Sequence, residues 1–135
     1  MPYIEWNNSY SVGIAEFDSQ HQKLVDIINR LHDAMKAGKG STIIGDILKE
    51  MVKYTITHFT AEERLLEIHG YPKLASQKSE HAYYVEKINA FVKEYESGTV
   101  MMSINVSQFL KDWLMKHILG TDKEYTAYLN GKGVK

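Results

Sequence analysis

Residues 41–66 read STIIGDILKEMVKYTITHFTAEERLL, and this stretch decides the fold class. Apolar or partly apolar side chains recur along it every three or four residues, at Ile44, Ile47, Leu48, Met51 and Tyr54. That spacing predicts an amphipathic helix with one face buried against a core. The same face continues through His58 and Glu62, so the helix also directs an imidazole and a carboxylate at the interior.

Three further stretches show the same helical period and are separated by short breaks. We expect a helix from a cap at Asp18 or Ser19 to Gly38, a second over 41–66 with Gly70 and Pro72 beyond it, a third over 73–97, and a fourth from near residue 103 to Gly120. Short connections favour antiparallel neighbours. The predicted fold is therefore all-α: an antiparallel up-down-up-down four-helix bundle with an irregular N-terminal arm over residues 1–17, forming a single domain over 1–135.

Composition narrows the functional classes. The chain has 135 residues, 44% of them hydrophobic, a formal net charge of -1 and no cysteine. The charge balance disfavours nucleic-acid binding, and the lack of cysteine excludes disulfides, thiolate catalysis and Cys-based metal sites. The sequence shows neither a secretory signal nor an apolar run long enough to span a membrane. We expect a soluble, cytoplasmic, monomeric protein whose metal chemistry, if present, uses His, Asp and Glu.

Each expected helix carries one histidine on its apolar face: His21, His58, His81 and His117. A single histidine on such a face is more often a hydrogen-bonded core residue than a ligand. Four on four helices, with Glu62 one turn from His58, favour a metal instead, because an unpaired buried carboxylate is costly. Imidazole and carboxylate together suit iron, zinc or manganese, and bundle interiors are a known place for di-metal carboxylate sites.

Asp122 is a second candidate carboxylate, five residues after His117. Taken alone, the TDKE sequence around it favours a helix cap, and we expect Gly120 to loosen the turn before it. Two histidines are set aside. His32 lies about 16 Å along the helix from His21, too far to share a metal, and His69 sits in the helix break IHGYP, where we expect it to be solvated.

Taken together, the segments DSQHQKLV, HFTAEE, EH and WLMKHILGTD, with IEW in the arm and KDW before His117, resemble the hemerythrins, and most closely the single-domain bacteriohemerythrins. The resemblance covers nearly the whole chain. It implies two iron ions (Fe2+/Fe3+) with an oxo or hydroxo bridge, which bind O2 reversibly. It places His21 and His58 on one iron, His81 and His117 on the other, and Glu62 and Asp122 as bridges between them. The resemblance thus overrules the cap interpretation of Asp122.

Gln77 is the departure from this pattern. The resemblance implies a third histidine on the second iron, four residues before His81, where this sequence has glutamine. An amide oxygen is a weaker donor than imidazole. Three outcomes stay open: Gln77 ligates the iron weakly, a water hydrogen-bonded to Gln77 takes the place, or that iron is lost. The first two are favoured because six other ligands remain. Our hypothesis is that Gln77 makes its iron more exchangeable and more open to exogenous ligands.

The resemblance also implies an open O2 position on the iron held by His21 and His58, inside an apolar pocket. Candidates for its wall share helix faces with the ligands, although plain core packing would look the same: Leu24, Phe59, Trp113, Leu114 and Ile118. O2 binding for carriage, storage or sensing is the leading function. The alternatives are a di-iron oxidase, peroxidase or NO-reactive enzyme, and a metal-poor interaction module. The interior shows no extra acid or base, unless Tyr54 or Tyr84 faces the site, which favours binding.

Overall fold

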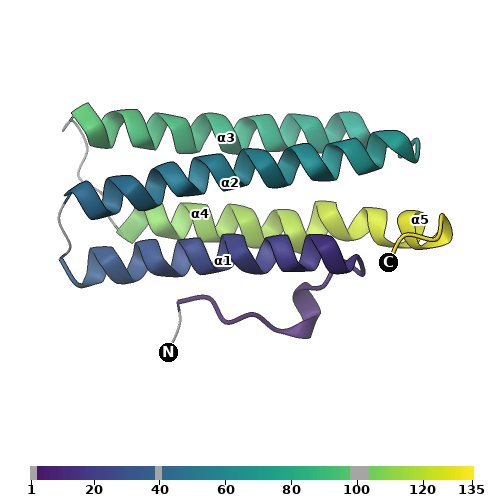
Figure 1. Ribbon diagram of the computed structural model, residues 1–135, viewed down its shortest axis with the longest axis horizontal. Coiled ribbons are helices and arrows are strands. Elements are labelled where there is room, and N and C mark those ends of the chain that lie inside the picture. Colours follow the sequence, from purple (N-terminus) through teal and green to yellow (C-terminus); the bar gives the residue numbers. More distant parts are fainter. Residues whose placement is uncertain (1–2, 39–40, 98–103) are drawn as a thin grey trace.

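The computed structural model describes residues 3–38, 41–97 and 104–135. Four long helices run alternately up and down along one axis, as Figure 1 shows: α1 (Ala15–Lys36), α2 (Ser41–Ile68), α3 (Leu74–Ser97) and α4 (Ile104–Lys116). No strand occurs in these ranges, so the predicted all-α bundle is confirmed. Within the same ranges, no helix is long and apolar enough to cross a membrane. The expected start of the fourth helix near residue 103 lies among residues 98–103, outside this description. The expected end of the first helix at Gly38 lies within it, and α1 ends two residues earlier, at Lys36.

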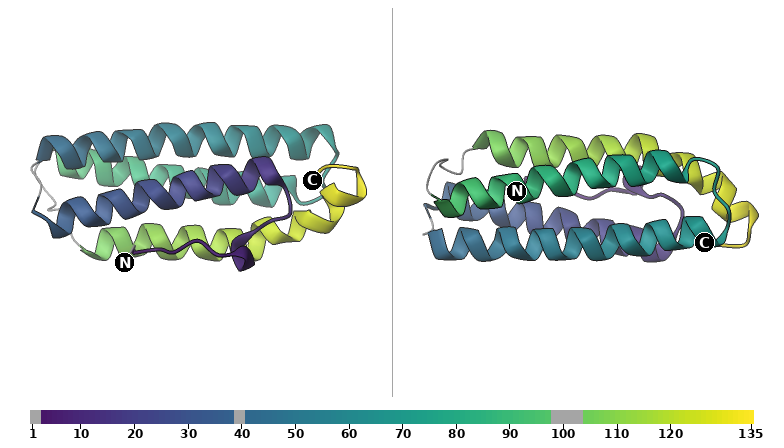
Figure 2. Two further views of the ribbon diagram at one scale, coloured as in Figure 1. Left: turned by 60° about the horizontal axis from the view of Figure 1, so that its bottom comes forward. Right: turned by 90° about the horizontal axis from the view of Figure 1, so that it is seen from above.

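The helices pack around a single apolar core. α1 lies against α2 and α4, and α3 lies against the same two helices, so the four surround one interior (Figure 2). Burial of apolar side chains there is the dominant force that holds the bundle together. The bulkiest fully buried side chains include Phe17, Leu24, Leu48, Tyr84 and Tyr125.

The first helix begins earlier than the sequence suggested. α1 starts at Ala15, so neither Asp18 nor Ser19 is its N-cap, and that prediction is wrong. The Asp18 carboxylate accepts hydrogen bonds from the Val12 amide (2.8 Å) and the Ser11 hydroxyl (2.5 Å), both in the preceding arm. Its negative charge in the first turn also suits the helix dipole. Asp18 therefore ties the arm to the first turn of α1.

The N-terminal arm is irregular but closely attached. Its first described residues run along the outside of the bundle to one short 3-10 helix, η1 (Asn8–Tyr10), after which the chain turns into α1 (Figure 2). The Ile4 amide donates to the side-chain oxygen of Asn29 (2.7 Å), and the Asn29 amide group donates back to the Ile4 carbonyl (2.8 Å). Tyr3 stacks on His32 with ring centroids 3.8 Å apart. The half-buried His32 thus serves the arm and takes no part in the cluster of ligand-type side chains.

The turn between α2 and α3 fixes how α3 faces the interior. Gly70 has a φ of 66°, the left-handed conformation that glycine adopts without strain. The amide of Tyr71 donates to the Leu66 carbonyl (2.9 Å) and that of Gly70 to Glu67 (3.1 Å), a Schellman motif that ends the helix. α2 thus ends where the sequence predicted. The half-buried His69 belongs to this turn, where its carbonyl accepts a hydrogen bond from the Tyr128 hydroxyl (2.6 Å).

The end of α4 carries the least regular backbone of the described chain. After Lys116 the chain forms a π-helical turn, η2 (His117–Thr121), then a 3-10 turn, η3 (Asp122–Tyr125), and a short helix, α5 (Thr126–Gly131). The amide of Asp122 bonds back to the carbonyl of His117, five residues earlier. Because a π-turn repeats every five residues or so, it places His117 and Asp122 on one face.

This turn corrects the role that the sequence gave to Gly120. The turn is wider than a regular α-helical turn, as expected, but the cause is the extra residue of the π-helix and not the glycine. Gly120 does not belong to the glycines with positive φ, and a Cβ built on it would meet no atom within 4 Å. Any residue that tolerates a helix could therefore stand at this position.

Candidate metal centre

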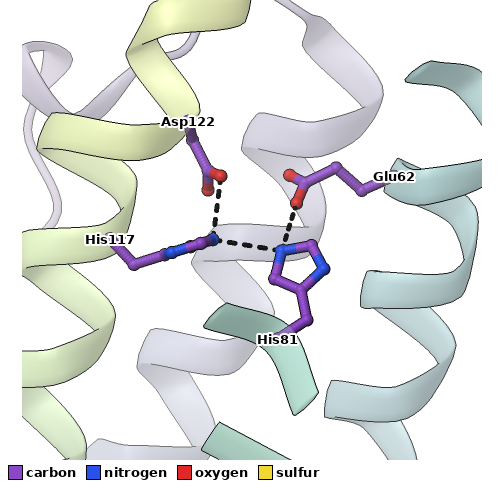
Figure 3. Close-up of side chains that lie close together, drawn as sticks. All are labelled: Glu62, His81, His117 and Asp122. Carbon is purple, nitrogen blue, oxygen red and sulfur yellow. Dashed lines mark hydrogen bonds and ion pairs between the residues drawn. The ribbon is translucent and has the colours of Figure 1, made fainter. Parts of the chain in front are cut away.

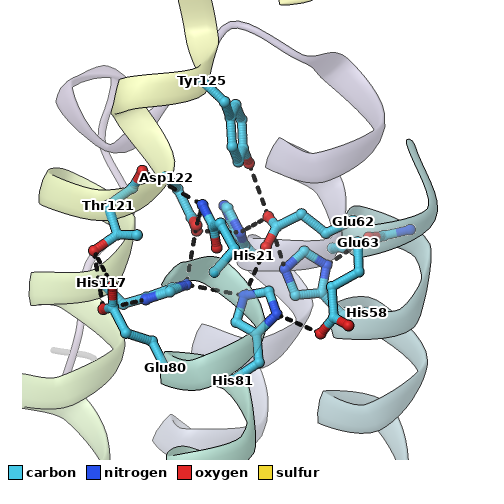
Figure 4. Close-up of polar contacts among 12 residues, drawn as sticks. His21, His58, Glu62, Glu63, Glu80, His81, His117, Thr121, Asp122 and Tyr125 are labelled. Atoms are coloured by element: carbon cyan, nitrogen blue, oxygen red, sulfur yellow. Dashed lines mark hydrogen bonds and ion pairs between the residues drawn. The ribbon is translucent and has the colours of Figure 1, made fainter. Parts of the chain in front are cut away.

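Four histidines and two carboxylates converge inside the bundle, from α1, α2, α3 and the turns that follow α4. Figure 3 shows four of these side chains pointing at one another, and Figure 4 adds the side chains around them. None is more than 2% exposed. The six residues that the sequence proposed as ligands all lie in this cluster: His21, His58, Glu62, His81, His117 and Asp122.

The cluster divides into two groups that share one carboxylate. His21, His58 and Glu62 bring ligand-type atoms within 4.8 Å of one another and form what we call the first half. Glu62 also belongs with His81, His117 and Asp122, the second half, under the same limit. The arrangement offers two adjacent positions for cations.

Both carboxylates direct one oxygen at each half. The Oε1 atom of Glu62 lies 3.0 Å from Nε2 of His81, while its Oε2 lies 3.5 Å from Nε2 of His58. In the same way Oδ1 of Asp122 lies 3.0 Å from Nε2 of His117, and its Oδ2 lies 3.3 Å from Nε2 of His21. This is the orientation that a pair of bridging carboxylates requires, and it excludes Asp122 as a simple helix cap.

Three of the histidines are oriented from behind through Nδ1. His58 contacts Oε1 of Gln20 at 2.5 Å, His81 contacts a carboxylate oxygen of Glu63 at 2.8 Å, and His117 contacts one of Glu80 at 3.0 Å. The Thr121 hydroxyl donates to the same Glu80 carboxylate (2.9 Å). A partner that accepts a hydrogen bond from Nδ1–H leaves the lone pair of Nε2 free to face the centre, as metal-binding histidines need.

The charges of the cluster interact strongly. Burial alone would lower the pKa of His21, but the Asp122 and Glu62 carboxylates outweigh it and raise that pKa to about 9. Burial is likewise outweighed at His117, where Asp122, Glu62 and Glu80 raise the pKa to about 9. At His58 burial prevails and lowers the pKa to about 4. Despite burial, the histidines hold the pKa of the Glu62 carboxyl well below its usual value.

The unsatisfied atoms of the cluster fit a cation. Within the described part of the chain, buried atoms without a hydrogen-bond partner include Nε2 of His21, Nε2 of His58 and Oδ2 of Asp122. Nε2 of His81 and Nε2 of His117 lie only 3.1 Å apart. With both rings protonated at Nδ1, their lone pairs would repel unless a proton or a metal ion lies between them. Nitrogen and carboxylate oxygen donors in this arrangement suit iron, zinc or manganese.

Gln77 lies at the cluster and is not a surface residue, with only 1% of its area exposed. Its amide nitrogen donates to Oδ1 of Asp122 (3.1 Å) and to the Thr121 carbonyl (3.4 Å). Both partners can only accept, so the nitrogen is fixed towards them. The amide oxygen is buried and has no hydrogen-bond partner among the described residues.

Several supporting residues escaped sequence reasoning. The hydroxyl of Tyr125 donates to Oε2 of Glu62 (2.8 Å), and no spacing rule pointed to that tyrosine. Gln20, Glu63 and Glu80 each adjoin a predicted ligand in the sequence, which is the one signal that could have found them. Tyr84, by contrast, donates to the Leu110 carbonyl (3.1 Å), so its hydroxyl is already occupied. Tyr54 is half-buried, with the ammonium group of Lys23 over its ring.

The apolar residues proposed as the O2 pocket divide between the two halves. Leu24, Leu114 and Ile118 are buried to within 1%. Phe59 stacks on the ring of His81 at 3.8 Å and lies 5.7 Å from that of His58, so it touches both halves. Trp113 is half-buried and stacks on His117 at 4.6 Å, on the second half.

Fold and site together define a helix-bundle metalloprotein with a histidine–carboxylate centre. Comparison with known proteins makes the class specific. The Hemerythrin HHE cation binding domain matches residues 12–129, so the chain belongs to the hemerythrin family. It is 31% identical to a bacteriohemerythrin of Stenotrophomonas maltophilia, over 96% of this chain and 86% of that one. It is 34% identical to a bacteriohemerythrin of Methylococcus capsulatus, over 96% of this chain and 99% of that one.

Solved structures agree with the sequence comparison. A crystal structure of wild-type hemerythrin superposes with a TM-score of 0.86 at 29% identity, covering 93% of this chain and 96% of that one. A leucine-to-alanine variant of hemerythrin gives a TM-score of 0.88 over 94% of this chain and 97% of that one. The bundle is therefore the hemerythrin fold, and its buried cluster fits a di-iron site.

Proposed function

We propose that this protein binds O2 reversibly at a non-haem di-iron centre, for carriage, storage or sensing. The observation that carries the proposal is the division of the buried cluster into two halves that share Glu62, with one oxygen of each carboxylate facing each half. The cofactor is two iron ions joined by an oxo or hydroxo bridge. When bound, the pair supplies the two electrons that hold O2.

The ligand assignment is supported by the two groups of ligand-type atoms. His21 and His58 would hold one iron, His81 and His117 would hold the other, and Glu62 and Asp122 would offer carboxylate oxygens to both. The protein's own contribution is to fix these side chains before metal arrives: Gln20, Glu63 and Glu80 orient the rings, and the Tyr125 hydroxyl donates to the Glu62 bridge. Orientation by neighbouring groups lets the site bind two cations with little rearrangement.

The open O2 position lies on the iron of the first half in this proposal. Its wall would be formed by apolar side chains that keep water away from bound oxygen and slow autoxidation: Leu24, Phe59, Leu114 and Ile118. Trp113, the fifth residue proposed from the sequence, stacks on His117 and so lies at the second half. We further propose that the chain acts as a single cytoplasmic domain over residues 1–135, as a monomer, on O2 or other small ligands, without nucleic-acid or membrane partners.

The test is anaerobic loading with Fe2+ followed by cycles of O2 and argon. We expect two iron ions per chain, and a visible absorption band that grows with O2 and disappears under argon. Glu67→Gln, on the exposed surface of α2, is the matched control and should behave like the wild type. Release of hydrogen peroxide with each O2 consumed, or turnover of peroxide or NO, would instead identify an enzyme. A folded chain that retains no iron would leave only an interaction module.

The enzyme alternative has less support. The relatives described above are named as hemerythrins and not as enzymes, which loosely favours binding. The hydroxyl of Tyr84 is committed to a backbone carbonyl, so it offers no free acid at the centre. Burial raises the pKa of Tyr125 well above its usual value, and so do the carboxylates near it. Tyr125 is therefore suited to donate a hydrogen bond to Glu62 and poorly suited to give up its proton.

A further inference from the structure

Gln77 connects the second half of the centre to the surface. It contacts Asp122 on the inner side and also lines a depression of about 330 Å³ together with Tyr71, Lys73, Ser76, Glu80, Thr121 and Glu124. This lining is mainly polar. Glu80, which orients His117, is 41% exposed at its side chain and belongs to the same wall. Small polar molecules can therefore approach Gln77 from solvent.

The two ends of the Gln77 amide have different tasks. The nitrogen is occupied by Asp122 and by the Thr121 carbonyl, which holds Asp122 in its bridging orientation. The oxygen is buried beside the centre and has no partner among the described residues. A buried carbonyl oxygen needs a donor, and a water molecule bound to a cation is a strong one. Glutamine thus suits a place where the metal carries an exchangeable ligand.

We infer that the metal of the second half keeps one exchangeable coordination place, occupied at rest by a water that donates to Oε1 of Gln77 and exchanged for small anions that enter through the polar depression. This inference rests on the proposed di-iron function and adds a second ligand-binding position to it. The first half serves O2 in an apolar setting, and the second half binds water and small anions in a polar one.

Azide is the probe, added to the oxidised, iron-loaded protein and followed by its infrared stretching band and by visible absorption. Iron content is measured first, so that loss of iron, which would contradict the di-iron function, is separated from a failure of this inference. We expect azide to bind at both metal positions in the wild type. We expect Gln77→His, which puts an imidazole in the exchangeable place, to bind azide at one position only. Gln22→His, on the exposed face of α1, is the matched control and should match the wild type.

A second variant keeps the test decisive if Gln77→His fails to fold or to bind iron. Gln77→Ala removes the hydrogen bond to Asp122 and the acceptor for the water, so azide should still bind at two positions, but more weakly at the second half. If Gln77 instead ligates the metal directly, the wild type will bind azide at a single position and Gln77→Ala will gain another. That result would overturn the inference, as would azide at both positions in Gln77→His.

The entry route has its own test. Ser76→Phe places an aromatic ring in the wall of the depression, whereas Ser79→Phe is an exposed substitution on the same helix outside that wall. We expect Ser76→Phe to slow azide association at one of the two positions about tenfold, and Ser79→Phe to leave both rates unchanged. Equal rates in the two variants would contradict entry through this depression.

Discussion

The first and second halves of the centre each contain two imidazoles but differ in the groups that contact the rings from behind. In the first half, His58 contacts the neutral amide of Gln20, and Nδ1 of His21 has no partner among the described residues. In the second half, the carboxylates of Glu63 and Glu80 contact His81 and His117. A carboxylate behind an imidazole makes it a stronger donor. The second half thus compensates for its neutral Gln77 with charge from its outer partners.

The halves also differ in their distance from solvent. Phe17, which is 1% exposed, packs edge-on against His58, and aromatic rings also stack on both histidines of the second half. The difference lies in the groups behind the rings. In the second half, the side chains of Glu63 and Glu80 are 26% and 41% exposed. A dry position suits reversible O2 binding, and a position in contact with polar surface suits ligand exchange. In the proposed di-iron centre, this difference would divide the labour between the two metals.

The largest effect is expected where the halves meet. Glu62→Ala removes the carboxylate that faces both, so iron content should fall almost to zero while the helices remain. Iron per chain, measured together with circular dichroism, tests this, and Glu67→Ala on the exposed face of the same helix is the control. Retention of both irons by Glu62→Ala would show that the halves do not depend on a shared ligand.

A second prediction concerns the metal-free protein, in which one histidine of each half binds a proton more tightly than usual. His21 and His117 have pKa values of about 9, above the ordinary 6.5. A raised pKa stabilises the fold fully below pH 6.5, and this contribution is lost as pH rises to 9. We expect the free energy of unfolding of the metal-free protein to fall over this range by on the order of 3 kcal/mol for each of the two histidines.

Urea titrations at several pH values measure that fall, and two variants compare the halves. His21→Gln and His117→Gln should each remove part of the pH dependence. The iron-loaded protein should show little of it, because bound metal replaces the protons. A metal-free protein that becomes more stable between pH 6.5 and 9 would contradict the protonation of both histidines.

Substitution of the residues that contact the histidines through Nδ1 should have a smaller effect on metal affinity, confined to one half. Glu63→Gln and Glu80→Gln keep the shape of each side chain but remove the charge, so we expect metal affinity at the second half to fall about 10- to 100-fold. Gln20→Leu should weaken the first half less, because it removes a neutral partner. A chelator that competes for the metal, with loss of each of the two metals followed separately, measures the affinity of each half. Equal losses in all three variants would remove the difference between the halves.

The smallest effect is expected at Gly120, which lies in the turn that supplies Asp122 to both halves. Since a Cβ there meets no atom within 4 Å, Gly120→Ala should leave iron binding unchanged. It should stabilise the fold by up to about 1 kcal/mol, because alanine favours helices more than glycine does. Loss of iron in Gly120→Ala would show that the glycine itself shapes the turn.

The sequence determined most of the bundle and the members of its cluster. Helical spacing along 41–66 and its counterparts was enough to place His21, His58, Glu62, His81 and His117 on inward faces, because a residue's direction on a helix follows from its position alone. Asp122 needed the family resemblance. A spacing of five matches no face of a regular α-helix, and local sequence does not announce a π-turn.

Only the tertiary structure decided how the side chains pair. Gln77 has the spacing of a ligand, yet its nitrogen holds Asp122 from another element, 45 residues away in sequence. Likewise Tyr125 contacts Glu62 across 63 residues, and Glu80 contacts His117 across 37. Periodicity gives the face on which a side chain lies, but a hydrogen bond depends on the angle and register between two helices. Those are set by packing of the whole core, which is why the sequence identified the members of the cluster and the fold decided what orients them.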